Sequence, residues 1–226
     1  MNKNSKMVKI FKLSGIVLCA LIFTSLTILV YFHKDEPLGI DASIRDFFYN
    51  IRGEKYGFIY WFFRIITEFG NLFLIILILI LILFYTKMDF RFFLTCFGLM
   101  LAIIINVGLK DLYNRERPFE EMRWAYEFSS SFPSGHSTAA GFLYTFLIYL
   151  VYHLDIKKWK KSSFTVGAVL LIILVMISRL VIGVHYFLDV IAGCATGIMV
   201  SCLCMLLYRY CVNNDILTKG LFERKR

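Results

Sequence analysis

Apolar residues along the chain are gathered into long runs, which short charged segments separate. A bilayer core about 30 Å thick is crossed by roughly 20 apolar helical residues, so a run near this length is typical of a membrane span. The pattern therefore predicts an all-α, polytopic membrane protein with six transmembrane helices. The predicted spans cover residues 13–32, 71–85, 92–109, 137–152, 164–182 and 188–210.

The segments between the spans differ in character. Residues 38–56 are polar and mixed in charge, and we expect a loop there. Residues 56–69 are rich in aromatic side chains and are expected to form a short helix that lies along the membrane interface or dips into it. Residues 110–135 are the longest polar stretch in the second half. With three prolines and no Ser/Gly-rich tract, residues 1–226 are predicted to form a single domain.

Composition supports a bilayer environment. Hydrophobic residues make up 59% of the chain and charged residues 18%, which is more apolar than a soluble globule of this length needs. In a soluble protein the net charge of +9 would suggest a nucleic acid partner. Here the basic residues lie mainly at the edges of apolar runs, where they suit anionic lipid headgroups. We therefore expect membrane lipids, and no nucleic acid, as partners.

The distribution of Lys and Arg between the predicted loops indicates how the chain crosses the cell membrane. Fifteen lie on the side of the two termini and ten on the other side. Because the more basic side faces the cytoplasm, both termini are predicted to be cytoplasmic and the 110–135 loop extracytoplasmic. The 13–32 run is longer than the core of a cleaved signal peptide and lacks a small-residue cleavage site, so we expect it to remain as an anchor.

Three polar clusters lie at predicted span ends, all on the outer side. Polar groups near a membrane are costly unless they are used or paired, so this convergence predicts a functional site. The clusters run from Lys110 to Arg117-Pro118, from Pro133 through Ser134 and Gly135 to His136, and from Ser178-Arg179 to His185 and Asp189.

The residue types in these clusters suit a small multivalent oxyanion. Lys110, Arg117 and Arg179 supply positive charge, and an Arg can contact two phosphate oxygens at once. Ser134 and Gly135 open a predicted helix, whose free backbone N–H groups point outward and favour an anion.

Two histidines supply candidate chemistry. His185 and Asp189 are four residues apart, so they share one face if this segment is helical. A carboxylate on one imidazole nitrogen raises the basicity of the other and prepares His185 as a nucleophile. His136 lies on the oxyanion-binding turn, where it is placed to protonate a leaving oxygen.

Together these clusters resemble the type 2 phosphatidic acid phosphatase superfamily, which also includes the vanadium haloperoxidases. Its pattern is K-x6-RP, PSGH and SR-x5-H-x3-D, and all three motifs stand intact between residues 110 and 189. The resemblance implies that His185 forms a phosphohistidine, that Asp189 orients it and that His136 is the general acid, without a metal or other cofactor. It also implies that five residues hold the phosphate: Lys110, Arg117, Ser134, Gly135 and Arg179.

The other residues of the 110–135 loop are expected to have less specific roles. Aromatic side chains at this depth match a belt at the headgroup level, and the sharper hypothesis is that some guide an acyl or prenyl chain. The belt residues are Phe119, Trp124, Tyr126, Phe128 and Phe132. The charged residues expected to be solvated are Arg115, Glu116, Glu120, Glu121 and Glu127.

Three functions remain open at this point. The leading one is a lipid phosphatase at the outer membrane face, acting on undecaprenyl diphosphate, phosphatidylglycerophosphate or phosphatidic acid. A lipid phosphotransferase would use the same intermediate and another acceptor. An anion-binding transporter is less favoured, because the charges lie at span ends and the sequence shows no internal repeat. The pattern leaves the oligomeric state open.

Overall fold

Helices form all the regular structure of the described residues, which confirms the all-α prediction. The structure is a computed structural model that describes residues 17, 20–34, 36–86 and 89–214. Residues 13–16 and 18–19 of the first predicted span lie outside this range. The helices are Ala20–Phe32, α2 (Gly39–Ile51), α3 (Phe58–Glu68), α4 (Leu72–Thr86), α5 (Phe90–Tyr113), the 3-10 turn η1 (Glu120–Met122), α6 (Gly135–Tyr152), α7 (Lys158–Val181) and α8 (Phe187–Asn213).

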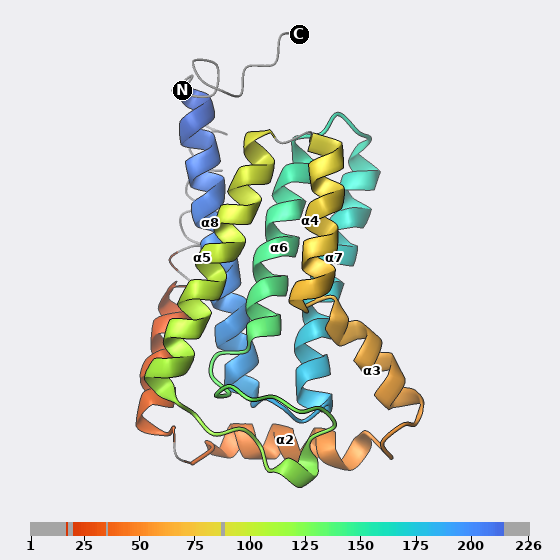
Figure 1. Cartoon of the computed structure of the whole chain (residues 1–226), viewed down its shortest axis with the longest axis vertical. Helices are drawn as coiled ribbons and strands as arrows, with labels where there is room; N and C mark the ends of the chain where they lie inside the picture. Colours follow the sequence, from red (N-terminus) through yellow and green to blue (C-terminus); the bar gives the residue numbers. More distant parts are fainter. Residues whose placement is uncertain (1–16, 18–19, 35, 87–88, 215–226) are drawn as a thin grey trace.

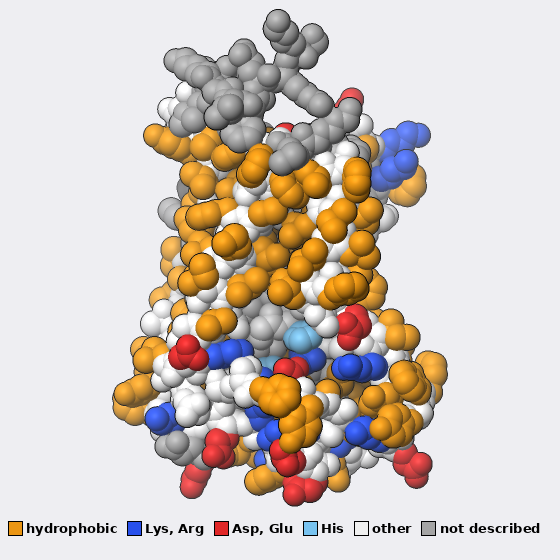
Figure 2. Space-filling view, viewed as in Figure 1, with side chains coloured by type: hydrophobic (Ala, Val, Ile, Leu, Met, Phe, Trp, Pro, Cys, Tyr) orange, Lys and Arg blue, Asp and Glu red, His pale blue; other side chains and the backbone are white. Residues whose placement is uncertain are grey.

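Figure 1 shows α4 to α8 side by side as a bundle, with α2 across one end and α3 sloping away from that end. Among the described residues, α5, α7 and α8 are each long and apolar enough to cross a membrane, and α3 with α4 passes the same test as a pair bent by 47°. The helix Ala20–Phe32 is apolar but shorter. In Figure 2 apolar side chains cover the shaft, while charged side chains gather at the end with α2 and α3. This division suits a bilayer around the shaft.

Residues 38–56 are mostly helical, so the loop predicted there is wrong. Ile40, Phe47 and Ile51 of α2 are each at least half exposed, whereas Asp41 is fully buried. Apolar side chains that face outward suit a helix lying at the headgroup level of a membrane. These apolar positions do recur at helical spacing, but the charges between them obscure the period.

The central helix α6 packs closely against α8 because glycines lie at their contact. A methyl group added at Gly197 would lie only 2.2 Å from the Thr138 carbonyl oxygen. One added at Gly193 would lie 2.4 Å from the Ser134 carbonyl oxygen. Small residues at such crossings are typical of membrane helices. The two helices therefore begin side by side, and Ser134 N donates a hydrogen bond to Asp189 O at 3.0 Å.

Replacing Gly197 by Ala is expected to lower the melting temperature, because the methyl group would overlap the α6 backbone and overpacking costs about 1–3 kcal/mol. The matched control is Gly167→Ala in α7, where an added methyl group meets nothing within 4 Å. There the higher helix propensity of Ala should stabilise the chain by up to about 1 kcal/mol. Thermal unfolding of both variants in one detergent measures the difference. Equal melting temperatures would contradict the close α6–α8 contact.

Candidate active site

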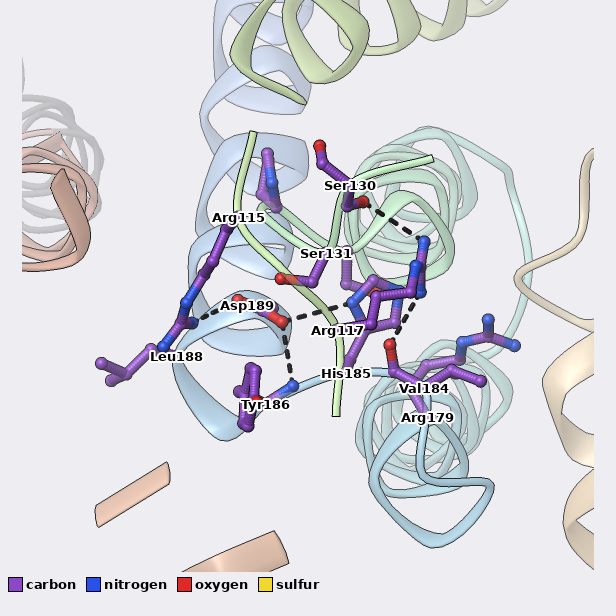
Figure 3. Close-up of polar contacts among 12 residues, drawn as sticks. Arg115, Arg117, Ser130, Ser131, Arg179, Val184, His185, Tyr186, Leu188 and Asp189 are labelled. Atoms are coloured by element: carbon purple, nitrogen blue, oxygen red, sulfur yellow. Dashed lines mark hydrogen bonds and ion pairs between the residues drawn. The ribbon is translucent and has the colours of Figure 1, made fainter. Parts of the chain in front are cut away.

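His185 lies in the turn between α7 and α8, with only 3% of its surface exposed. Gly183 shapes this turn with a φ of +79°, a left-handed conformation that glycine adopts without strain. Because α8 begins only at Phe187, the segment 185–189 is not helical throughout, and the condition for His185 and Asp189 to share a helix face is not met. Asp189 nevertheless reaches the imidazole from the first turn of α8, with its Oδ2 3.4 Å from His185 Nδ1 (Figure 3).

The partners of this imidazole indicate which nitrogen is free to react. The Asp189 carboxylate faces Nδ1 without forming a hydrogen bond to it among the described residues, and this arrangement favours the proton on that nitrogen. Arg117 Nη1 lies 3.3 Å from Nε2 and donates a hydrogen bond to Val184 O at 2.7 Å. The lone pair of Nε2 thus faces a guanidinium group, which is also a strong binding group for phosphate oxygens.

Burial and nearby positive charge keep His185 neutral. Burial lowers the pKa of His185 well below its usual value, and the charges of Arg117, Arg179 and Lys110 lower this pKa further. Burial also lowers the pKa of Arg117, to about 10, so its guanidinium remains charged at neutral pH. A neutral imidazole beside fixed positive charge is the state that a nucleophile toward an anion requires.

The three cations predicted from the motifs come from three places in the chain and meet around His185. Lys110 lies in the last turn of α5, Arg117 in the loop that follows, and Arg179 in the last turn of α7. Arg179 is 1% exposed and donates a hydrogen bond to Thr67 Oγ1 at 2.8 Å. Its position is thus fixed by α3 as well as by α7.

The second motif opens α6 as predicted. Ser134 is the N-cap of this helix and is fully buried, and its Oγ accepts a hydrogen bond from Ser137 N at 3.4 Å. Gly135 is the first helical residue and His136 the second. The free N–H groups of this helix therefore lie beside the first turn of α8, which carries Asp189.

His136 borders two cavities of different character. One is polar, has a volume of about 470 Å³ and is also lined by Arg179 and Trp124. The other has a volume of about 240 Å³, lies between α4, α5 and α6, and is largely apolar, with Leu72 and Ile103 in its lining. His136 therefore lies between a polar space that Arg179 also lines and a largely apolar one.

Arg115 is buried, so the expectation that it is solvated is wrong. Its Nη1 lies 2.6 Å from Asp189 Oδ1, and its Nη2 lies 2.6 Å from Asp41 Oδ2. All three side chains are at most 1% exposed, and Figure 3 shows the contact between Arg115 and Asp189. Asp41 also accepts a hydrogen bond from Leu188 N at 3.0 Å. This row of alternating charges ties α2 to α8 and holds the carboxylate that faces His185.

Glu127 is not a solvated loop charge either. Its carboxylate forms an ion pair with Arg179 and lies 4.0 Å from Arg117 Nη2. Two members of the predicted aromatic belt, Trp124 and Phe132, are buried, at 7% and 0% exposure. The other three are exposed: Phe119, Tyr126 and Phe128.

The sequence prediction missed Asp41, Arg115 and Glu127 as members of the site. Asp41 and Arg115 are 74 residues apart, so no motif spacing could pair them. The available signal was local: Arg115 lies inside the first motif, and Asp41 lies among apolar residues at helical spacing.

Removal of the Asp41 carboxylate should destabilise the fold strongly. Asp41→Ala leaves the buried Arg115 charge partly uncompensated, and breaking a buried pair typically costs about 3–5 kcal/mol. Asp46→Ala in the same helix is the control, because Asp46 is half exposed and, within the described part of the chain, its ion pair is with its neighbour Arg45. An exposed pair of this kind contributes at most about 1 kcal/mol. Unfolding of both variants in denaturant tests this, and similar losses would count against the buried row.

His185 should make the folded state less stable in acid. Because its pKa is lower in the folded chain than in the unfolded chain, stability is complete above about pH 6.5 and falls as the pH drops toward the folded-state pKa. The loss should approach about 1.4 kcal/mol per pH unit. Thermal unfolding across this range measures it, and His185→Gln should flatten the curve while the control His153→Gln should not. Parallel curves for wild type and His185→Gln would refute the assignment.

Comparisons with known proteins agree with the motif prediction. A family model described as the PAP2 superfamily matches residues 91–213. The chain is 39% identical over 98 residues to phosphatidylglycerophosphatase B of Bacillus subtilis (strain 168). This match covers 42% of this chain and 47% of that protein. It is 32% identical over 114 residues to the "putative undecaprenyl-diphosphatase YbjG" of Escherichia coli (strain K12), covering 47% and 50%. The matched part thus spans about half the length of these curated relatives.

The fold is also similar to solved structures. The crystal structure of the first transmembrane PAP2 type phosphatidylglycerolphosphate phosphatase from Bacillus subtilis matches with a TM-score of 0.74 and 26% identity, over 87% of this chain and 96% of that one. Aquifex aeolicus LpxE matches in fold, with a TM-score of 0.62 and 21% identity over 75% and 96% of the two chains. Since the family model covers more than half of the residues and includes all three motifs, the chain belongs to the PAP2 superfamily.

Proposed function

We propose that the chain is a membrane lipid phosphatase that removes phosphate from a lipid phosphomonoester or diphosphate. The main support is the meeting of His185 with three cations, one of which, Arg117, lies 3.3 Å from the reactive Nε2. Fixed positive charge around a neutral, oriented imidazole favours nucleophilic attack at phosphorus. Membership of the PAP2 superfamily and the names of the two curated relatives favour the same reaction class.

In the proposed reaction, His185 Nε2 attacks phosphorus while the bond between phosphorus and the lipid oxygen breaks. Burial and the charge of Arg179 lower the pKa of His136 in the free chain, so the protonated imidazole that acts as the acid is the form that the bound phosphate anion stabilises. His136 gives this proton to the lipid oxygen, and Asp189 stabilises the imidazole of His185 as it becomes positively charged. Water, deprotonated by His136, then attacks the phosphohistidine, which releases inorganic phosphate. Each step uses side chains of the chain itself, so we propose metal independence. The residues that would bind the phosphate oxygens are Lys110, Arg117, Ser134, Gly135 and Arg179.

The apolar cavity beside His136 supports a lipid as the leaving group. It lies between α4, α5 and α6, so an acyl or prenyl chain in it would stay in contact with the bilayer. The printed names of the relatives favour phosphatidylglycerophosphate and undecaprenyl diphosphate as substrates, with phosphatidic acid as a third candidate.

We also propose that residues 1–226 form one domain of six spans with α2 and α3 at the interface. The three long apolar helices, the bent pair of α3 and α4, and the apolar Ala20–Phe32 support five of these spans. The sixth, residues 137–152, belongs to α6, which is less apolar and lies in the middle of the bundle (Figure 1). The charge distribution of the loops favours cytoplasmic termini and an extracytoplasmic site.

The purified chain in detergent should release phosphate from at least one of the three candidate lipids, with EDTA present. His185→Ala should lower the rate by about a thousandfold or more, because it removes the attacking atom. The control His153→Ala should be close to wild type, since His153 follows the opposite end of α6. A membrane-impermeant substrate supplied to intact cells tests the outward orientation of the site.

Each result has a defined consequence. Absence of phosphate release from all three lipids would refute the phosphatase proposal. Strict dependence on added metal would refute the mechanism, and transfer of labelled phosphate to an added lipid acceptor in preference to water would favour the phosphotransferase. Normal activity of His185→Ala would exclude the phosphohistidine.

A further inference from the structure

The cations of the site have acceptors from one short segment, residues 127–130. Arg117 Nε donates to Ser129 O at 2.7 Å, and Lys110 Nζ donates to Ser130 O. Glu127 provides a carboxylate to Arg179. Of these acceptors only Glu127 carries a negative charge. Its side chain lines the polar cavity that His136 also borders.

The Glu127 contact uses only part of the Arg179 guanidinium. Nη2 meets the Glu127 carboxylate and Nη1 donates to Thr67 Oγ1, whereas Nε is buried without a hydrogen-bond partner among the described residues. Adjacent Nε and Nη2 groups form a fork that suits two oxygens of one phosphate. The fork is therefore better matched to a bidentate oxyanion than to the single carboxylate oxygen it now contacts.

The segment that carries Glu127 is held by backbone hydrogen bonds at its two ends and by Arg117 and Lys110 at Ser129 and Ser130. Trp124 N donates to Ile182 O and Ser131 N donates to Arg115 O, both at 2.8 Å. Between these two points, no backbone–backbone hydrogen bond is formed within the described part of the chain. The neighbours of Glu127 are exposed, Tyr126 by 76% and Phe128 by 97%. Glu127 can therefore turn outward without disrupting a packed core.

We propose that Glu127 is a specificity-determining residue that occupies the phosphate-binding arginines and is exchanged for the incoming phosphate. A phosphate dianion has more charge and more acceptor oxygens than a carboxylate, so it can displace Glu127 where a weaker anion cannot. The carboxylate cannot stay beside the phosphate, because two like charges would then share one site. The inference rests on the phosphate-binding role proposed above for Arg117 and Arg179, and it makes Glu127 a selector for phosphomonoester and diphosphate groups.

The test is calorimetric binding of inorganic phosphate to the full chain in detergent. Glu127→Gln removes the competing charge and should tighten phosphate binding by about tenfold. The matched control is Glu121→Gln in the same loop, at an exposed residue, which should change the affinity by less than about twofold. Glu127→Asp keeps the charge but shortens the side chain, so its affinity should fall between wild type and Glu127→Gln.

The effect of acetate on phosphate affinity is a second measurement, and it would not differ between wild type and Glu127→Gln if the role of Glu127 were merely structural. As a free carboxylate, acetate should weaken phosphate binding to Glu127→Gln much more than to wild type, because it takes the place of the missing carboxylate. Phosphate binding that is unchanged or weaker in folded Glu127→Gln, or equal effects of acetate on both proteins, would overturn the proposal. If Glu127→Gln does not fold, a Glu127→Asp affinity no tighter than wild type does the same.

This measurement is independent of turnover. Tighter phosphate binding by Glu127→Gln in a chain that hydrolyses none of the three lipids would support the exchange and refute the hydrolase. Lipid hydrolysis by the wild type, with phosphate binding unchanged in Glu127→Gln, would support the hydrolase and refute the exchange.

Discussion

The carboxylate of Asp189 is buried at the base of the site, and the surrounding structure depends on how its charge is compensated. Arg115 pairs with it at 2.6 Å, and Asp41 pairs with the other side of Arg115 at the same distance. A charge taken out of water alone costs several kcal/mol, whereas alternating charges with hydrogen bonds offset much of that cost. The positions of α2, the loop after α5 and the start of α8 are therefore coupled, and the orientation of His185 follows from them.

Close packing of α6 against α8 is the second feature that brings the site residues together. Gly193 and Gly197 allow α8 to approach the backbone of α6, so the helix starts that carry Asp189 and His136 lie together. The cations then come from the ends of α5 and α7 and from the loop between α5 and α6. A site built from helix ends in this way keeps ionic groups near water while the shaft remains apolar.

The sequence predicts well those features that depend on neighbouring residues. Long apolar runs predict α5, α7 and α8, and motif spacing predicts the cations and histidines that meet in the structure, because both are local signals. The pairing of Asp41 with Arg115 is not predictable in this way, since it joins segments far apart in the chain. The ion pairs of Arg115 and Glu127 also join distant segments, so from the sequence both residues are expected in solvent. The helix α2 is not predicted because charged residues interrupt its apolar period. The phosphate-binding role of Arg117 and Arg179 remains a prediction.

Buried arginines that are to bind phosphate present a physical conflict. Without acceptors they would be costly in the folded chain, yet strong acceptors compete with the phosphate. Here most of the acceptors are neutral, as with Thr67 Oγ1 for Arg179 and Val184 O for Arg117, and such groups can remain when an anion arrives. A carboxylate such as Glu127 cannot remain, because it repels the anion. The phosphate affinity of such a site therefore depends on how much more strongly phosphate binds the guanidinium groups than the carboxylate does. The number of cations matters less.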